Sequence, residues 1–301
     1  LLPSWARPRA QAVTFMHPAD RRPIFVIPWE GTILIGTTDL DHGEDLGNEP
    51  AMTQEEAFYL MEGLVDCFPS LSLNMDQALS SFSGLRPVVS EGNDRPPSEE
   101  SRDHVIWTDK GLVTVTGGKL TTFRRLAWDA LNEAFQFIPG GATIDRTPPA
   151  FETVRSSPRE DSRKEVMNRR LFGRYGREAA AMLENTSNDA LRPLPGTNVL
   201  LIEVMQGARE GIRHLDDLLL RRVRLGLLRA DGGLELLDHI QQVCEPLLPW
   251  NRKRWKDERI RYRTILEEAY GLPGRAPLPG AVREGLLEKG VRKIREAVRT
   301  G

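Results

Sequence analysis

Gly111-Leu112-Val113-Thr114-Val115-Thr116-Gly117-Gly118-Lys119-Leu120-Thr121-Thr122-Phe123-Arg124 is the stretch that decides the fold. Its first half is β-like, and helical apolar spacing begins at Phe123. A helix that starts here leaves backbone N–H groups unpaired and carries about half a positive charge at that end. Two glycines let a ligand approach the backbone, Lys119 adds a charge, and Thr121 or Thr122 offers a capping hydroxyl. We interpret the turn as a site for an anion or an electron-rich ring edge, with glycines that serve only packing as the alternative.

Composition restricts the class of protein. The chain has 301 residues, 40% of them hydrophobic and 28% charged, which is typical of a globular protein with two domains. No apolar run approaches the roughly 18 residues that span a bilayer. The two cysteines, Cys67 and Cys244, lie far apart, and the five histidines show no metal-ligand spacing. We expect reduced thiols, a cytoplasmic location and no metal.

The two halves of the chain differ in charge. Residues 1–150 hold 12 Lys and Arg against 21 Asp and Glu, a net charge of −9. The remaining 29 basic and 22 acidic residues give residues 151–301 a net charge of +7. Single arginines in an acidic half predict local anion sites instead of a broad basic surface, so nucleic acid is not an expected partner.

The first part of the chain alternates between strands and helices. Strands are predicted over residues 12–16, 23–28, 31–36 and 79–89, with a second hairpin over 104–108 and 112–116. Thr53 and Glu56 form a capping-box pattern at the start of a helix that ends at Pro69. This order predicts an α+β domain over residues 1–137.

The second part is predicted to be almost entirely helical. Residues 138–159 contain Pro139-Gly140-Gly141 and Pro148-Pro149 and are interpreted as a linker. Helical periodicity follows at about 160–172, 175–185, 202–227, 233–246, 251–270 and 281–299. We therefore expect an all-α domain over residues 160–301.

Three cationic side chains are predicted to stand at element edges: Arg86, Arg102 and Lys119. Arg86 interrupts an apolar strand, which is costly for a guanidinium that meets no anion. Arginine presents a fork of donors and lysine a compact charge, so three such groups together would bind a phosphate dianion. Ordinary ion pairs, Arg86 with Asp39 and Arg102 with Asp103, are the alternative.

Four motifs in this order resemble one enzyme family. They are Ile35-Gly36-Thr37-Thr38-Asp39, Gly84-Leu85-Arg86-Pro87, Ser101-Arg102 and the Gly117–Arg124 segment. Together they are similar to the FAD-dependent sn-glycerol-3-phosphate dehydrogenases, quinone-linked flavoproteins built like D-amino-acid oxidase. Residues 213–222 resemble the helical C-terminal domain of that family. The resemblance implies an antiparallel-sheet substrate domain followed by an all-α domain.

The resemblance also implies a reaction and a site. The reaction oxidises sn-glycerol 3-phosphate to dihydroxyacetone phosphate, with FAD as cofactor and a quinone or another electron acceptor. Substrate would be held by Arg86, Arg102 and Lys119, and the flavin would be contacted by Gly117, Gly118, Lys119, Leu120 and Thr121. For Thr37, Thr38 and Asp39 a purely structural turn is an equally good interpretation.

One departure from the family pattern is large. The chain lacks the Gly-x-Gly-x-x-Gly unit that cradles the FAD pyrophosphate, and it lacks the segment with the family's catalytic histidine. His17 and His104 do not match that position and are expected to face solvent. We therefore assign no catalytic residue, and we expect the C-terminal part of a longer enzyme that is inactive alone.

Two other functions stay open. The chain could be a non-catalytic fragment or subunit that docks an FAD-binding partner, or part of a flavin oxidase of an amine or hydroxy acid.

Two segments of the helical part have competing interpretations. The run Trp250–Lys256 mixes tryptophan with cations, which suits an anionic membrane surface on the inner face of the cell membrane, but a charged helix start with a buried tryptophan is favoured. Asp216 and Asp217 with Arg221 and Arg222 predict structural pairing along one helix. A homodimer is left open.

Overall fold

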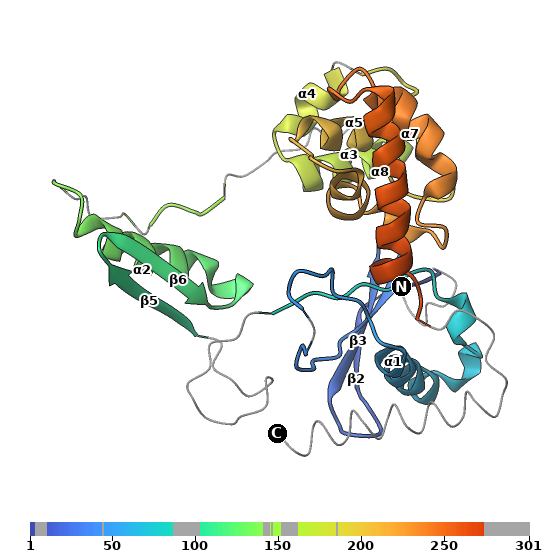
Figure 1. Cartoon of the computed structure of the whole chain (residues 1–301), viewed down its shortest axis with the longest axis horizontal. Helices are drawn as coiled ribbons and strands as arrows, with labels where there is room; N and C mark the ends of the chain where they lie inside the picture. The colour runs from blue at the N-terminus through green and yellow to red at the C-terminus, as the bar shows by residue number, and fades with distance from the viewer. Residues whose placement is uncertain are drawn as a thin grey trace. The chain divides into compact units, whose positions relative to one another are not determined.

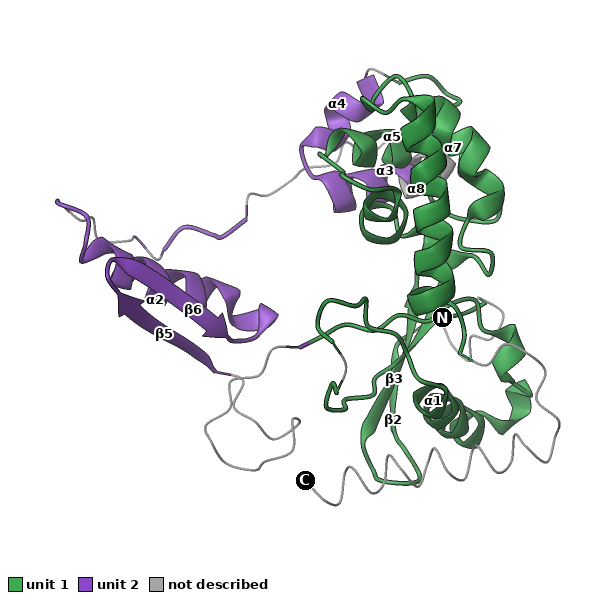
Figure 2. Ribbon diagram, viewed as in Figure 1, with its two compact units in different colours: residues 1–85, 186–301 green, residues 86–185 purple. Residues whose placement is uncertain are grey.

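The computed structural model describes residues 1–3, 11–43, 45–86, 103–140, 145, 147–151, 162–184 and 186–273. The chain divides into two compact units, one of residues 1–85 and 186–301 and one of residues 86–185 (Figure 2). The expected boundaries at residues 137 and 160 stay a prediction.

The larger unit contains a four-stranded antiparallel sheet in the order β1-β4-β3-β2 (Figure 1). Its strands are β1 (Leu2–Pro3), β2 (Val13–Met16), β3 (Pro23–Trp29) and β4 (Thr32–Gly36). Glu30 and Gly31 close the β3–β4 hairpin with φ angles of 50° and 81°, the left-handed backbone that a two-residue turn requires. The three strands expected over residues 12–36 are confirmed.

Helix α1 (Gln54–Cys67) packs against this sheet. Its capping box is present, because the Glu56 amide donates to Thr53 Oγ1 at 3.2 Å and the Thr53 amide donates to Glu56 Oε2 at 3.0 Å. The apolar side chains between the sheet and the helix are buried, among them Ile24, Val26, Ile33, Tyr59, Leu60 and Leu64. Alternation along β3 turns Phe25 and Ile27 to the other face, where they are exposed.

The strand expected over residues 79–89 is wrong for the part that the structure describes, which ends at Arg86. Two short 3₁₀ turns, η2 (Pro69–Leu71) and η3 (Met75–Gln77), lead into an extended segment without a ladder. The Leu79 amide donates to the Leu1 carbonyl at 2.7 Å, and the Ser81 amide donates to the Tyr270 carbonyl at 3.1 Å. Because these bonds go to different elements, burial here does not produce a strand.

The rest of the larger unit is helical and has its own core. Its elements are α5 (Leu201–Arg209), η5 (Asp217–Arg222), α6 (Leu225–Leu228), η6 (Leu234–Leu236), α7 (Leu237–Cys244), α8 (Arg252–Ile265) and η7 (Leu266–Tyr270). The single helix expected over residues 202–227 is wrong. Left-handed backbone at Gly211 (φ 73°) and Arg224 (φ 58°) breaks it into three pieces. The helix expected over 281–299 lies outside the described residues.

The smaller unit begins with a hairpin and a helix. Strands β5 (His104–Asp109) and β6 (Leu112–Gly117) pair as expected, and η4 (Leu120–Thr122) leads into α2 (Phe123–Phe135). Helices α3 (Ser162–Tyr175) and α4 (Glu178–Glu184) follow the predicted linker. Helix α2 contacts both strands but buries none of its residues completely. Trp107 is 48% exposed and Leu112 68% exposed, so the hairpin carries apolar side chains on an uncovered face.

No helix in the described part of the chain combines the length and the apolar character needed to cross a bilayer.

Candidate functional site

The two glycines before Lys119 have left-handed backbones, with φ angles of 75° at Gly117 and 87° at Gly118. A Cβ on Gly117 would lie 2.6 Å from the Asp103 carbonyl oxygen, and one on Gly118 would lie 2.7 Å from Leu126 Cδ1. Both positions therefore require glycine for conformation and packing. This part of the geometry supports the packing interpretation of the turn.

The start of the helix after the glycines is nevertheless open. Thr122 directly precedes α2, but its hydroxyl donates to the Lys119 carbonyl at 3.0 Å and does not accept from the helix. The capping role expected for Thr121 or Thr122 is therefore wrong. Leu120 is 89% exposed, and in the described regions no acceptor lies against the amides of Leu120 and Thr121. These donors and the dipole of α2 remain available to an electron-rich group.

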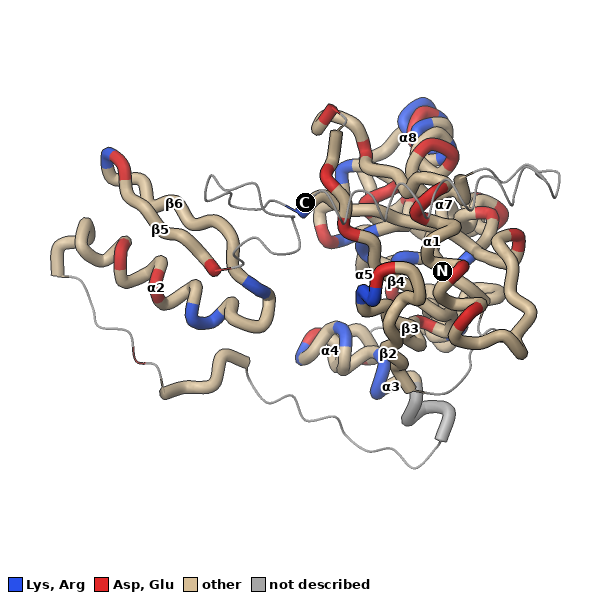
Figure 3. The backbone as a smooth tube through the Cα atoms, turned by 90° about the horizontal axis from the view of Figure 1, so that it is seen from below, with Lys and Arg blue, Asp and Glu red and all other residues tan. Residues whose placement is uncertain are grey.

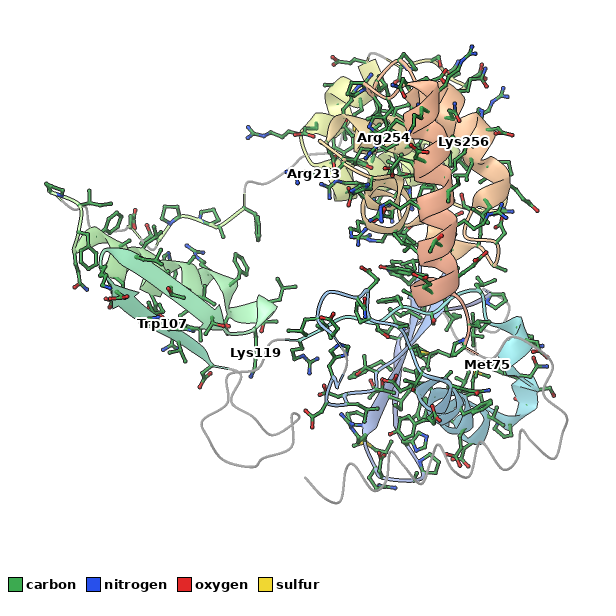
Figure 4. All side chains as sticks on the ribbon, viewed as in Figure 1. Met75, Trp107, Lys119, Arg213, Arg254 and Lys256 are labelled. Atoms are coloured by element: carbon green, nitrogen blue, oxygen red, sulfur yellow. The ribbon has the colours of Figure 1, made fainter. Side chains whose placement is uncertain are left out.

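Lys119 lies just after the end of β6 (Figure 4). It lines a hollow of about 300 Å³. The other lining residues are Asp103, His104, Thr122, Arg125 and Asp129. His104 Nε2 lies 3.0 Å from Asp129 Oδ2, and Arg125 Nε lies 3.7 Å from the same oxygen. In the described part of the chain, the exposed Lys119 ammonium has no carboxylate within ion-pair distance. The hollow thus combines a paired carboxylate with a lysine that can meet an incoming anion.

The other two predicted cations cannot be placed in this hollow. Arg86 is exposed at the end of the described segment 45–86. Arg102 lies outside the described residues. The convergence of Arg86, Arg102 and Lys119 on one anion stays a prediction.

The segment after β4 has structural bonds of its own. Thr38 Oγ1 donates to Glu56 Oε1 at 2.5 Å. Arg22 donates to the Asp39 carbonyl at 3.2 Å, and its guanidinium lies 3.7 Å from the Asp39 carboxylate. These contacts favour the structural interpretation of Thr38 and Asp39.

Two family models match the chain in sequence order. The model described as FAD dependent oxidoreductase matches residues 2–124, and the model described as C-terminal domain of alpha-glycerophosphate oxidase matches residues 137–255. Glycerol-3-phosphate dehydrogenase 2 of Mycobacterium tuberculosis is 31% identical over 269 residues, which cover 82% of this chain and 45% of the relative. Aerobic glycerol-3-phosphate dehydrogenase of Bacillus subtilis is 45% identical over 122 residues, or 40% of this chain and 21% of the relative.

The chain belongs to the FAD-dependent glycerol-3-phosphate dehydrogenase family.

The expected family and fold class are confirmed. The chain is similar in fold to the X-ray structure of the glycerol-3-phosphate dehydrogenase from Bacillus halodurans complexed with FAD, with a TM-score of 0.62 and 24% identity. That similarity covers 92% of this chain and 56% of the other chain. FAD is the cofactor of the family. The chain spans about half the length of the Mycobacterium tuberculosis relative.

His17 and His104 are placed differently from the expectation. His17 is completely buried and stacks on Tyr59, with 3.8 Å between ring centroids. The Ala19 amide donates to His17 Nδ1 at 3.1 Å, so Nε2 carries the proton and donates to the Tyr59 carbonyl at 2.8 Å. His104 is half-buried against Asp129. The expectation that these side chains face solvent is wrong, because it took no account of partners distant in sequence.

The helical domain contains a buried ionic network. Arg221 Nη1 lies 2.6 Å from Asp216 Oδ2, which confirms the predicted i,i+5 pair, and the π-helical turn η5 aligns residues five apart. Arg261 lies 3.4 Å from the other Asp216 oxygen. The predicted pairing of Arg222 within the same run is wrong, because Arg222 instead pairs with Glu210 at 3.1 Å.

Glu258 on α8 forms the second half of the network. Its carboxylate, 2% exposed, lies 2.7 Å from Arg254 and 2.9 Å from His214 Nδ1, and it accepts from the Leu215 amide at 2.8 Å. His214, Asp216 and Glu258 form the one group with metal-ligand spacing in the described regions. Because Arg221, Arg254 and Arg261 already neutralise both carboxylates, the group fits an ion-pair network better than a metal site.

The tryptophans at the start of α8 are packed. Trp255 is 2% exposed, and its ring lies 4.8 Å from that of Trp250. Asn251 caps the helix by accepting from the Arg254 amide at 2.9 Å. The favoured interpretation of this run, a charged helix start with a buried tryptophan, is confirmed.

Proposed function

We propose that this chain is the substrate-binding and helical part of an enzyme that oxidises sn-glycerol 3-phosphate to dihydroxyacetone phosphate. Electrons would pass through FAD to a quinone or another acceptor. The observation that carries the proposal is the ordered match of both family models over residues 2–255. The open helix start beside Lys119 supports it, because that arrangement suits an anionic substrate beside a flavin.

The backbone from Gly117 to Thr121 is the part of the chain that we assign to the flavin. The left-handed glycines, the exposed Leu120 and the amides of Leu120 and Thr121, which have no acceptor among the described residues, fit a planar ring with an electron-rich edge. FAD supplies the hydride acceptor when it is bound. The role of this segment is to orient the ring and to favour negative charge on its edge.

Substrate binding is assigned to Lys119, Arg102 and Arg86. A phosphate dianion would meet the compact charge of the lysine and the donor forks of the arginines. Holding the phosphate fixes the position of the carbinol carbon, and such orientation can supply about 7–11 kcal/mol in the most favourable cases. We assign no proton-accepting base to this chain.

The test of this proposal is reduction of the flavin in the full-length enzyme without oxygen. Glycerol 3-phosphate should reduce it, and glycerol should do so far more slowly. Equal reduction by both compounds would contradict the proposed substrate. An amine or hydroxy acid that reduces it faster would favour the oxidase alternative.

Substitutions test the residues. Lys119→Ala should raise KM about tenfold or more and also alter the flavin spectrum, because Lys119 adjoins the flavin segment. Arg102→Ala should raise KM with the spectrum largely unchanged. Lys256→Ala is the matched control, since Lys256 is an exposed cation on α8 (Figure 4) and should change neither. An unchanged KM after Arg102→Ala would remove Arg102 from the site.

The docking alternative is favoured by one observation, the exposed apolar face of the β5–β6 hairpin. Val105, Trp107 and Leu112 are 42%, 48% and 68% exposed there. We propose that this face packs against an FAD-binding unit in the assembled enzyme. The full-length protein should be yellow because it binds FAD, and this chain alone should be nearly colourless. A yellow colour of this chain alone would contradict the proposal that a separate unit binds FAD.

The identity of the electron acceptor determines where we expect the assembled enzyme to be located. A quinone would bring the assembled cytoplasmic enzyme to the inner membrane surface. Membrane flotation of the full-length enzyme tests this, and activity only with a soluble acceptor would contradict it.

A further inference from the structure

His104 is the residue that touches both sides of the turn carrying Lys119. As the first residue of β5 it pairs with Gly117, the last residue of β6. Its side chain crosses to α2, where Nε2 lies 3.0 Å from Asp129 Oδ2. His104 therefore contacts both ends of the segment from Gly117 to Asp129. Its backbone pairs with Gly117, and its imidazole contacts Asp129.

The packing around Gly118 adds to this connection. A Cβ on Gly118 would lie 3.4 Å from His104 Cβ and 2.7 Å from Leu126 Cδ1. The glycine thus admits both the Cβ of His104 and the Leu126 side chain of α2 against the turn. His104 and Lys119 line the same hollow.

Two other charged groups line the hollow, Arg125 and Asp103. Arg125 approaches the same Asp129 oxygen, but it belongs to α2 and its side chain is 78% exposed. An ion pair four residues apart within one helix does not tie that helix to a strand. Asp103 precedes β5 and is exposed at the rim. His104–Asp129 is a side-chain pair that joins β5 to α2 within the described part of the smaller unit.

We infer that His104 and Asp129 are a positioning pair, which fixes the start of α2 and thereby holds Lys119 and the Leu120 and Thr121 amides in place. The inference rests on the proposed function for the role of Lys119 toward substrate. The fixed turn itself is independent of that role. His104 would act through Lys119, not on the substrate.

The first test needs no substrate. Hydrogen exchange of the full-length enzyme reports on the Thr122 amide, which donates to the Lys119 carbonyl at 2.9 Å. His104→Ala should speed exchange across residues 118–124 about tenfold, because the restraint on the turn is lost. His104→Gln should restore most of the protection, since its amide can still donate to Asp129.

The second test measures coupling through the substrate. His104→Ala should raise KM for glycerol 3-phosphate about tenfold, and the increase should vanish in a Lys119→Ala background. A merely structural histidine would give multiplicative effects in the double variant. Asp129→Asn should behave like a milder His104→Ala.

His214→Ala is the matched control, because His214 also pairs with a carboxylate, Glu258 at 2.9 Å, but belongs to the other unit. It should leave exchange at residues 118–124 unchanged. Unchanged exchange after His104→Ala, or independent effects of His104 and Lys119 on KM, would overturn the positioning role. If the enzyme oxidises glycerol as readily as glycerol 3-phosphate, the proposed substrate is wrong. Faster exchange after His104→Ala in that same enzyme would still support the positioning role of His104.

Discussion

Gly117 and Gly111 lie in one hairpin with similar backbones but different surroundings. Their φ angles are 75° and 83°, so alanine is strained at either position. A Cβ on Gly117 would lie 2.6 Å from the Asp103 carbonyl oxygen, whereas one on Gly111 would meet nothing within 4 Å. The pair therefore separates backbone strain from steric conflict.

Alanine at Gly111 should lower the free energy of unfolding by about 1 kcal/mol, the cost of a left-handed alanine. Gly117→Ala should cost about 3 kcal/mol, because a backbone carbonyl must also move. Urea unfolding followed by hydrogen exchange of the hairpin measures both. Equal losses would show that the contact with Asp103 does not restrain the turn.

The two cysteines should differ in reactivity. Burial raises the pKa of the Cys244 thiol to about 12, and burial also raises the pKa of the half-buried Cys67. Because the thiolate is the nucleophile, Cys244 stays protonated and unreactive as the pH rises from 7 to 9. Iodoacetamide should label Cys67 first over that range, and Cys244 only after unfolding. Rapid labelling of Cys244 at pH 7 would contradict its burial.

At the scale of elements, α8 organises the helical domain. Its basic and acidic residues are interleaved along the helix (Figure 3), but only some of them connect to other elements. Glu258 reaches His214 and the Leu215 amide, and so fixes the segment that begins η5. Its neighbour Asp257 is 51% exposed and pairs with Lys253 within the helix.

Glu258→Ala should destabilise the protein by about 1–3 kcal/mol, because the buried Leu215 amide loses its acceptor. Arg254 is 43% exposed, so water can solvate its guanidinium in the variant. Asp257→Ala is the control and should cause little change, since an exposed pair within one helix contributes little. Thermal unfolding of both variants gives the comparison. Similar melting temperatures would mean that water replaces the Glu258 contacts.

At the scale of the whole molecule, the uncovered hairpin face determines how the chain behaves alone. Trp107→Ser should leave the stability of this chain almost unchanged, because the side chain is half exposed (Figure 4). In the full-length enzyme it should lower the melting temperature and weaken FAD retention, if an FAD-binding unit covers the face. Ile260→Ser, 58% exposed on α8, is the control. No difference between the variants in the full-length enzyme would exclude this face from the assembly.

Sequence alone determined the family, the capped helix at Thr53, both hairpins and the glycine turn at Lys119, because these depend on neighbouring residues and on periodicity. Periodicity did not reveal the breaks at Gly211 and Arg224, since apolar spacing continues through them. Only the tertiary structure decided the pairs His104–Asp129, His17–Tyr59 and His214–Glu258, whose members are 25, 42 and 44 positions apart. The physical reason is that a buried polar group takes whichever partner the packing brings to it.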